Sequence, residues 1–185
     1  MQTIFVHDPP PAELQELLAR RRQTGADRHD ELWEGVLHMA PAPHWRHALV
    51  QAQVLELVGP AARGRGLTAV ADMNLGEPDD YRVPDASLTL PAGELFNPTA
   101  VLAVEILPPG DTTLQKLPFY AAHGVDEVVI VDPDERTVRW LALDEDEYVP
   151  IERSSVIDLS AEAMADRIDW PACLEVPEVL DPNQR

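Results

Sequence analysis

The chain has 185 residues, of which 45% are hydrophobic and 25% charged, so it is long enough to bury the core of one ordinary globular domain. The net charge of −19 leaves little basic surface for a nucleic acid, and the single cysteine, Cys173, excludes both an internal disulfide and a zinc site of the paired-cysteine type. No apolar run is long enough to span a membrane and no secretory signal is visible, so we expect a cytoplasmic protein.

The N-terminal third alternates between helix and strand patterns. An apolar stripe with charge elsewhere predicts a helix over about 11–22, closed by Gly25. Residues 31–39 predict two short strands that meet near Glu34-Gly35. A second helix is expected over about 44–62, and because it is apolar on two faces it should be mostly buried.

The middle of the chain is typical of strands. Residues 67–71 predict a short strand, and residues 81–90 alternate in the manner of another. Residues 99–107 form a continuous apolar run, which indicates a central strand covered on both faces. A third helix should then extend to about His123, where Gly124 ends it.

The C-terminal part returns to strands before it becomes acidic. Strands are predicted over 125–131, 136–143 and 148–152. A short helix over 160–167, with Ser160 as its N-cap, begins an acidic tail over about 160–185 that we expect to be loosely packed. Together the elements predict one α/β domain over 1–185, with a mixed β-sheet flanked by helices.

Lys116 is the only lysine in the chain. A proline is tolerated in the first turn of a helix but not in its interior, so Pro118 places Lys116 at the start of the third helix. A cation at that end opposes the helix dipole, at a cost of about 0.3–1 kcal/mol. Lys116 should therefore lie opposite an anion, or it is simply solvated.

Two carboxylates sit on strand-like segments near this lysine in the sequence. Asp85 follows Val83-Pro84, and Glu105 lies near the end of the apolar run. Carboxylates on rigid strands suit Mg²⁺ or Mn²⁺, and an ammonium beside them can stabilise developing charge on a phosphate. The pattern therefore indicates a metal-dependent nuclease site, with a buried carboxylate–lysine ion pair as an equally open alternative.

Two further residues are weaker candidates. Glu34, at the strand junction, is a potential third acid or a water-positioning group, or else an ordinary turn carboxylate. His44 and His47 lie three residues apart at the start of the second helix and share a face. Such a pair is weak evidence for a metal, and helix-start polarity also explains it.

An ordered set of motifs between Asp30 and Leu143 resembles the Uma2 family, also called domain of unknown function 820. The segments are Glu34-Gly35, Met39-Ala40-Pro41, His47, Val83-Pro84-Asp85, Ala103-Val104-Glu105-Ile106-Leu107, Lys116-Leu117-Pro118-Phe119-Tyr120, Gly124-Val125-Asp126-Glu127 and Val131-Asp132-Pro133. The family is grouped with the restriction-endonuclease-like folds of PD-(D/E)xK type and is labelled a putative endonuclease.

The resemblance implies a role for each candidate residue. Pro84-Asp85 would be the PD, and Glu105 the second acid. The position two beyond Glu105 is Leu107, which implies that the catalytic lysine has migrated to the following helix as Lys116. Glu34 would be the acid of the N-terminal part of the site.

Two functions follow as hypotheses. The first is a Mg²⁺- or Mn²⁺-dependent endonuclease in which Asp85 and Glu105 bind the metal, Lys116 stabilises charge, Glu34 is an auxiliary acid, and DNA is the partner despite the acidic charge. The second is a degenerate nuclease fold that binds rather than cuts, as a homodimer or as a partner in a mobile-element or defence system. The net charge of −19 favours the second, because a DNA enzyme with so little basic surface depends on a local groove, a metal or a basic partner.

Overall fold

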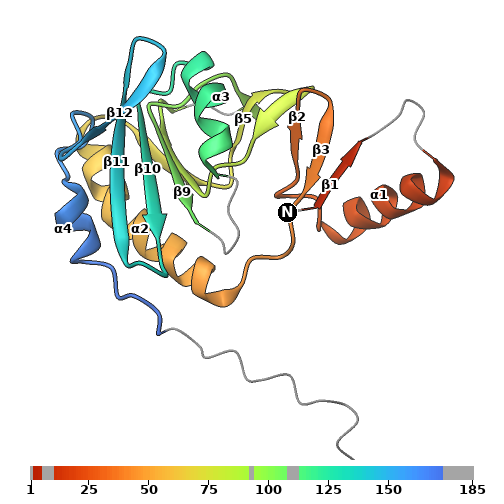
Figure 1. Ribbon diagram of the computed structural model, residues 1–185, viewed down its shortest axis with the longest axis horizontal. Helices are drawn as coiled ribbons and strands as arrows, with labels where there is room; N and C mark the ends of the chain where they lie inside the picture. The colour runs from red at the N-terminus through yellow and green to blue at the C-terminus, as the bar shows by residue number, and fades with distance from the viewer. Residues whose placement is uncertain (1, 6–10, 92–93, 108–112, 173–185) are drawn as a thin grey trace, which may run out of the picture.

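The computed structural model describes residues 2–5, 11–91, 94–107 and 113–172. Two layers of sheet are combined with helices that lie between them and outside them (Figure 1). The helices are α1 (Ala12–Thr24), α2 (Trp45–Gly64), α3 (Leu117–Ala122), which follows the 3₁₀ turn η1 (Thr113–Lys116), and α4 (Ala161–Ala165).

The first sheet, sheet A, is built from the N-terminal half of the chain. Its strands, in spatial order, are β1 (Gln2–Phe5), β3 (Val36–Met39), β2 (Glu31–Trp33), β6 (Asp80–Arg82), β5 (Asn74–Glu77) and β8 (Phe96–Asn97). Neighbouring strands are antiparallel except for β5 and β8, which are parallel. Figure 1 shows α1 at the outer side of this sheet.

The second sheet, sheet B, holds the longer strands. Its spatial order is β12 (Glu147–Ile151), β11 (Thr137–Asp144), β10 (Glu127–Asp132), β9 (Leu102–Ile106), β7 (Ala86–Thr89) and β4 (Thr68–Ala71). The central strands β9 and β10 are parallel, and α3 lies on the crossover between them. This is the strand–helix–strand unit that the sequence predicts.

One face of sheet B is covered by α2. Every fourth residue along this helix is fully buried, and the buried set packs against alternate side chains of β7, β9, β10 and β11. The helix contributes Val50, Val54, Val58 and Ala62. The second helix that the sequence predicts is thus present, but the expectation that it is mostly buried is wrong: only this stripe is buried, and Ala48 and Ala52 on another face are exposed.

The other face of sheet B is covered by α3, which also contacts sheet A. Phe119 and Tyr120 of α3 are buried with Ala103 of β9, Val128 of β10 and Leu75 of β5. In Figure 1, α3 accordingly lies between the two sheets. Side chains of sheet A, of sheet B and of α3 can therefore meet in one place.

The segment from Ser160 to Pro171 is more closely packed than the predicted acidic tail. Ser160 caps α4 by accepting from the backbone N–H of Ala163 at 3.1 Å, as predicted. However, Met164 and Ile168 are buried in the core beside α2. The expectation of a loose tail is wrong for this segment because these side chains supply the apolar contact, and residues 173–185 lie outside the described part.

Two other expectations need correction. The alternating run over 81–90 is not one strand: it forms β6 in sheet A and β7 in sheet B, and the chain crosses between sheets at Val83-Pro84-Asp85. Pro84 cannot donate to a strand ladder, which favours a break there. As a result the fold has two mixed sheets rather than one.

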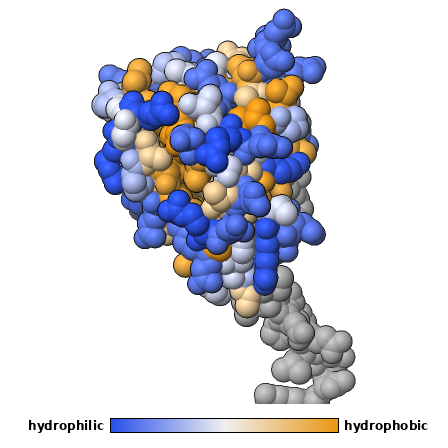
Figure 2. All heavy atoms as spheres, turned by 90° about the vertical axis from the view of Figure 1, so that its left-hand side faces the viewer, coloured by the Kyte–Doolittle hydropathy of each residue, from blue (hydrophilic) through white to orange (hydrophobic). Residues whose placement is uncertain are grey.

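The surface is mixed in character. Figure 2 shows the side of the molecule that carries α4 and β12, where apolar patches are interrupted by hydrophilic groups. Among the described helices, none is both long enough and apolar enough to cross a membrane.

Candidate acid–lysine site between the two sheets

Glu105 points away from the α2 side of sheet B. Its neighbours Val104 and Ile106 are buried in the core beside α2, whereas Ala103 is buried on the α3 side. Because successive side chains of a strand face opposite ways, Glu105 faces α3. The continuous apolar run of the sequence therefore delivers one carboxylate into the space between the sheets.

Lys116 joins Glu105 to a carboxylate of the other sheet. Its ammonium Nζ lies 3.0 Å from both Oε1 and Oε2 of Glu105 and 2.8 Å from Oε1 of Glu31 on β2. All three side chains are buried. The predicted helix-start cation thus lies opposite two anions, one from each sheet.

Both carboxylates receive further hydrogen bonds. Tyr120, four residues after Lys116 and on the same face of α3, donates its hydroxyl to Oε1 of Glu105. Glu31 accepts from the indole Nε1–H of Trp33 at 2.7 Å and from the backbone N–H of Val83 at 2.8 Å. Buried charges are tolerated when they are paired and hydrogen-bonded in this way.

Asp85 lies beside this cluster at the crossover between the sheets. Its Oδ2 accepts from the backbone N–H of Ile106 at 2.6 Å, so its carboxylate is fixed next to the strand residue that follows Glu105. Its Oδ1 lies 2.8 Å from Nε2 of His47 on α2, and its backbone carbonyl accepts from Gln51 at 2.7 Å. Asp85 is thus oriented by β9 and by α2.

Burial, together with the neighbouring charges, shifts the pKa values in the site. Burial raises the pKa of Glu105 to about 7; Lys116 opposes this rise, while Asp85 and Glu31 add to it. Burial alone would lower the pKa of Lys116, but Glu105 and Glu31 outweigh burial and raise it. Burial, with Glu105, also raises the pKa of Tyr120, so the phenol stays a donor at neutral pH.

The pKa of His47 is also raised. Burial alone would lower it, but the hydrogen bond to Asp85 and the charge of that carboxylate outweigh burial. His44, by contrast, caps α2 and accepts from the backbone N–H of Arg46 at 3.3 Å. The two histidines therefore have separate partners, and only His47 contacts a candidate acid.

Of the predicted site residues, the structure brings together Asp85, Glu105 and Lys116 but not Glu34. Glu34 is exposed in the turn between β2 and β3, with a φ of 48°, and its backbone N–H donates to Asp80 at 3.2 Å. The acid from this hairpin that contacts Lys116 is Glu31.

Sequence reasoning missed Glu31 and Tyr120. On β2 it is the charged Glu31 that is buried, whereas its apolar neighbour Leu32 is only half-buried. A signal was present in the strand alternation, since Glu31 and Trp33 share a face and form a hydrogen bond. For Tyr120 the signal was its spacing of four residues from Lys116.

The donor set fits a hard divalent cation. Two carboxylates, those of Glu31 and Glu105, contact the ammonium, and a third, that of Asp85, lies next to them beside His47, so the site offers several hard oxygen donors. Within the described ranges, no group of three or more His, Cys, Asp or Glu side chains forms a ready metal cage. Mg²⁺ does not need one, because one or two carboxylates with waters and a substrate phosphate suffice.

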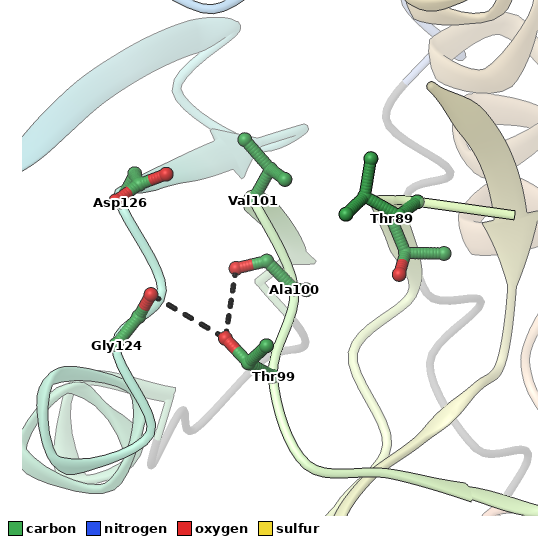
Figure 3. A pocket seen from close by; sticks show the side chains of 7 residues that line it. Thr89, Thr99, Ala100, Val101, Gly124 and Asp126 are labelled. Carbon is green, nitrogen blue, oxygen red and sulfur yellow. Dashed lines mark hydrogen bonds between the residues drawn. The ribbon is translucent and has the colours of Figure 1, made fainter. Parts of the chain in front are cut away.

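A small cavity of about 170 Å³ lies elsewhere, near the start of β9 (Figure 3). Among the side chains that line it, the hydroxyl of Thr99 donates to the carbonyls of Ala100 and Gly124 at 3.3 and 3.4 Å. Glu105 lies toward the other end of the same strand. This cavity is therefore not part of the acid–lysine site.

The chain is thus a two-sheet α/β domain with a buried acid–lysine cluster between its sheets. The Uma2 family, described as putative restriction endonuclease, matches residues 12–165, and the chain belongs to this family. Among curated proteins, none matches the sequence.

A solved structure supports the fold. A putative nuclease of the DUF820 family from Anabaena variabilis ATCC 29413 is similar, with a TM-score of 0.60 and 21% identity over 75% of this chain and 90% of that one. A DrdV–DNA complex matches with a TM-score of 0.37 and 19% identity over 64% of this chain and 11% of that one, which is too low to support an argument. The restriction-endonuclease-like α/β fold expected from the sequence is thus confirmed.

Proposed function

We propose that the protein is a metal-dependent nuclease that hydrolyses phosphodiester bonds of nucleic acid. The observation that carries the proposal is the convergence of Lys116, Glu105 and Asp85, with the ammonium 3.0 Å from Glu105 and the Asp85 carboxylate 2.6 Å from the next backbone N–H. A buried cluster with more carboxylates than cations is suited to recruit a divalent ion and a phosphate.

Asp85 and Glu105 would hold Mg²⁺ or Mn²⁺. When bound, such an ion polarises the scissile phosphate and lowers the pKa of a bound water. Asp85 is kept in orientation by Ile106 N–H and His47, and Glu105 by Lys116 and Tyr120. Preorganised groups of this kind need no rearrangement when charge develops on the phosphate.

Lys116 would have two effects in this reaction. Its ammonium favours the ionised form of Glu105, which is the form that binds a metal. It also adds fixed positive charge near the phosphate, as the migrated lysine of the PD-(D/E)xK pattern would. Glu31, rather than Glu34, would be the auxiliary acid, because it is the acid that fixes the ammonium.

The experiment compares wild type with Asp85→Asn, using Asp144→Asn, an exposed aspartate at the end of β11, as the matched control. Mn²⁺ binding is measured by calorimetry, and cleavage of labelled single- and double-stranded DNA is measured with Mg²⁺ or Mn²⁺. We expect Asp85→Asn to lose Mn²⁺ binding and to cleave on the order of 100-fold more slowly, while the control matches wild type. Equal Mn²⁺ affinity and turnover in wild type and Asp85→Asn would contradict the proposal.

The second candidate is the binding module without catalysis. The observation that favours it is that Lys116 is already paired with two carboxylates, so that the cluster also serves as a structural ion-pair network. This candidate predicts no turnover with either metal and DNA binding that does not depend on Asp85. Binding of DNA through phosphates should weaken steeply as salt rises.

A further inference from the structure

A second, larger cleft lies close to the candidate site and has no part in the arrangement described so far. It has a volume of about 460 Å³, within the ~300–1,000 Å³ typical of ligand sites. Its lining comes from the segment after α1, from the β4–β5 loop, from β5 and β6, and from the residue before β8: Asp27, Arg28, His29, Asp72, Asn74, Tyr81 and Leu95.

One side chain connects this cleft to Asp85. The amide Nε2 of Gln51 donates to the backbone carbonyl of Asp85 at 2.7 Å and to Oδ1 of Asp72, in the cleft wall, at 2.8 Å. On the other side of Asp72, the ring Nδ1 of His29 lies 3.6 Å from the same Oδ1. The side chain of Gln51 therefore links the wall of the cleft to the backbone of the candidate catalytic acid.

The lining combines an aromatic ring with both donors and acceptors. Tyr81 is half-buried, and its ring is braced by an edge contact with Phe96, with ring centres 5.2 Å apart. Asp72 and Asn74 offer acceptor oxygens, while His29 and Arg28 offer donors. Two carboxylates, Asp27 and Asp72, make the interior a poor place for a phosphate. A planar nucleobase, with a stacking face and polar edges, matches this set.

An exposed arginine lies at the cleft. Arg28 is one of the residues that line it. Arg21, which lies between the exposed Arg20 and Arg22, forms an ion pair with Asp30. Arg28 thus provides a cation for a backbone phosphate at a cleft whose interior suits a base.

We propose that this cleft binds an unpaired nucleobase, with the flanking backbone phosphate directed toward Asp85. The inference rests on the proposed function for its choice of nucleic acid as the ligand. A base stacked inside a duplex cannot enter a cleft of this kind, so the substrate is single-stranded nucleic acid or a locally unpaired site. A local base pocket also explains how a chain with a charge of −19 holds a polyanion without an extended basic surface.

The test measures binding of a short fluorescein-labelled oligothymidylate, and of a duplex of the same length, by anisotropy in EDTA, so that no cleavage occurs. The variants are Tyr81→Leu, Tyr81→Phe, which keeps the ring, and His29→Ala, which lies outside the strands in case Tyr81→Leu does not fold. Arg28→Ala is matched with Arg139→Ala, an exposed arginine on β11 of sheet B.

Wild type should bind the single strand more tightly than the duplex. Tyr81→Leu should weaken single-strand binding by about fivefold or more, and Tyr81→Phe by less than about twofold, since stacking depends on the ring. His29→Ala should weaken it as well, and Arg28→Ala should reduce its salt dependence while Arg139→Ala does not. Unchanged single-strand binding in folded Tyr81→Leu or in His29→Ala would overturn the inference, as would a preference of wild type for the duplex.

These outcomes separate the inference from the proposed function. If wild type cleaves DNA but Tyr81→Leu and His29→Ala bind and cleave as wild type does, the proposed base pocket is wrong and the proposed nuclease activity is supported. If single-strand binding depends on Tyr81 but neither metal supports cleavage, the proposed base pocket is supported and the proposed nuclease activity is wrong. If wild type neither binds nor cleaves, both are wrong.

Discussion

Glu31 and Lys116 belong to opposite halves of the chain, yet their charged atoms lie 2.8 Å apart between the two sheets. The same ammonium contacts Glu105 on the other sheet. One cation therefore links sheet A, sheet B and α3, and the predictions below begin from this link.

Lys116→Met should destabilise the fold. The substitution keeps most of the side-chain volume but leaves Glu31 and Glu105 buried without their cation, and breaking a buried pair from one side costs about 3–5 kcal/mol. The free energy of unfolding, from urea denaturation, measures the effect. Arg139→Met, at an exposed site, should change it by less than about 0.5 kcal/mol. A Lys116→Met protein as stable as wild type would show that the cluster is not an ion-pair network in solution.

Glu31→Gln and Glu34→Gln should behave differently. The glutamine at position 31 would leave a donor amide facing the ammonium, the Trp33 indole or the Val83 amide, at a cost of about 1–3 kcal/mol. Because Glu34 is exposed, Glu34→Gln should change the free energy of unfolding by less than about 0.5 kcal/mol. Urea denaturation and the cleavage assay apply to both variants. A larger defect in Glu34→Gln would restore Glu34 as the auxiliary acid.

Stability should fall with rising pH because of Glu105. Its pKa is about 7 in the folded protein against an ordinary value of 4.5, so the folded state binds more protons between these values. This contribution to stability is present below about pH 4.5 and is lost as pH rises through about 7, up to a limit of roughly 3 kcal/mol.

The measurement for this effect is the difference in unfolding free energy between wild type and Glu105→Gln at about pH 5 and about pH 8. Groups common to both proteins cancel in the difference. Wild type should lose stability relative to the glutamine variant at the higher pH. A difference that does not vary with pH, or that varies in the opposite direction, would show that Glu105 is ionised throughout.

Glu127→Gln should weaken the fold without affecting cleavage. Glu127 is a buried acid outside the candidate site, and its carboxylate accepts from the Trp140 indole at 2.7 Å, from Ser154 at 2.5 Å, and from both the backbone and the hydroxyl of Ser155 at 2.8 Å. An amide cannot accept all four bonds, so we expect a loss of about 1–3 kcal/mol in thermal or urea unfolding. Turnover below the melting temperature should match wild type, and a large loss of turnover in the folded variant would place Glu127 in the catalytic machinery.

Gly76→Ala should be strongly destabilising. Gly76 on β5 has a φ of 117°, and an added Cβ would lie 2.5 Å from the carbonyl oxygen of Asp80 and 2.8 Å from the ring of Phe119. The strained backbone and the overlap together cost on the order of 2–5 kcal/mol, which calorimetric melting would detect. Gly64→Ala is the control, since a Cβ there meets nothing within 4 Å and alanine favours a helix. Equal melting temperatures for the two variants would contradict the close approach of α3 to β5.

Strong periodic patterns in the sequence predicted most elements, and the regions in error have identifiable causes. The helix α2, with its buried stripe, and the strands β9 and β10 carry long apolar patterns, so local sequence was sufficient. The crossover at Pro84 was missed because β6 and β7 are both short and continue one alternating pattern in different sheets. Nothing local distinguishes one bent segment from two strands in separate layers.

For the site, sequence patterns found the residues whose position is fixed locally. Glu105 lies on a central strand, and Pro118 places Lys116 at a helix start. Glu31 depends on how sheet A packs against α3, which is a long-range property. Glu34 is favoured by its place at the junction of the two strands and by the family resemblance. The turn conformation that Glu34 adopts, with positive φ, directs it to solvent instead.

The position of Lys116 between the sheets also has a consequence for how the chain can diverge. A relative without nuclease activity would still lose folding stability on substitution of these residues. Loss of Lys116 leaves two buried carboxylates without their cation, and loss of Glu31 or Glu105 removes the acceptor of buried hydrogen bonds. Selection for folding alone is thus enough to retain these three residues. Asp85 is different: it is half-buried and contacts a histidine and a backbone amide rather than the ammonium. Under the proposed function, a descendant that lost catalysis is therefore expected to acquire substitutions at position 85 first.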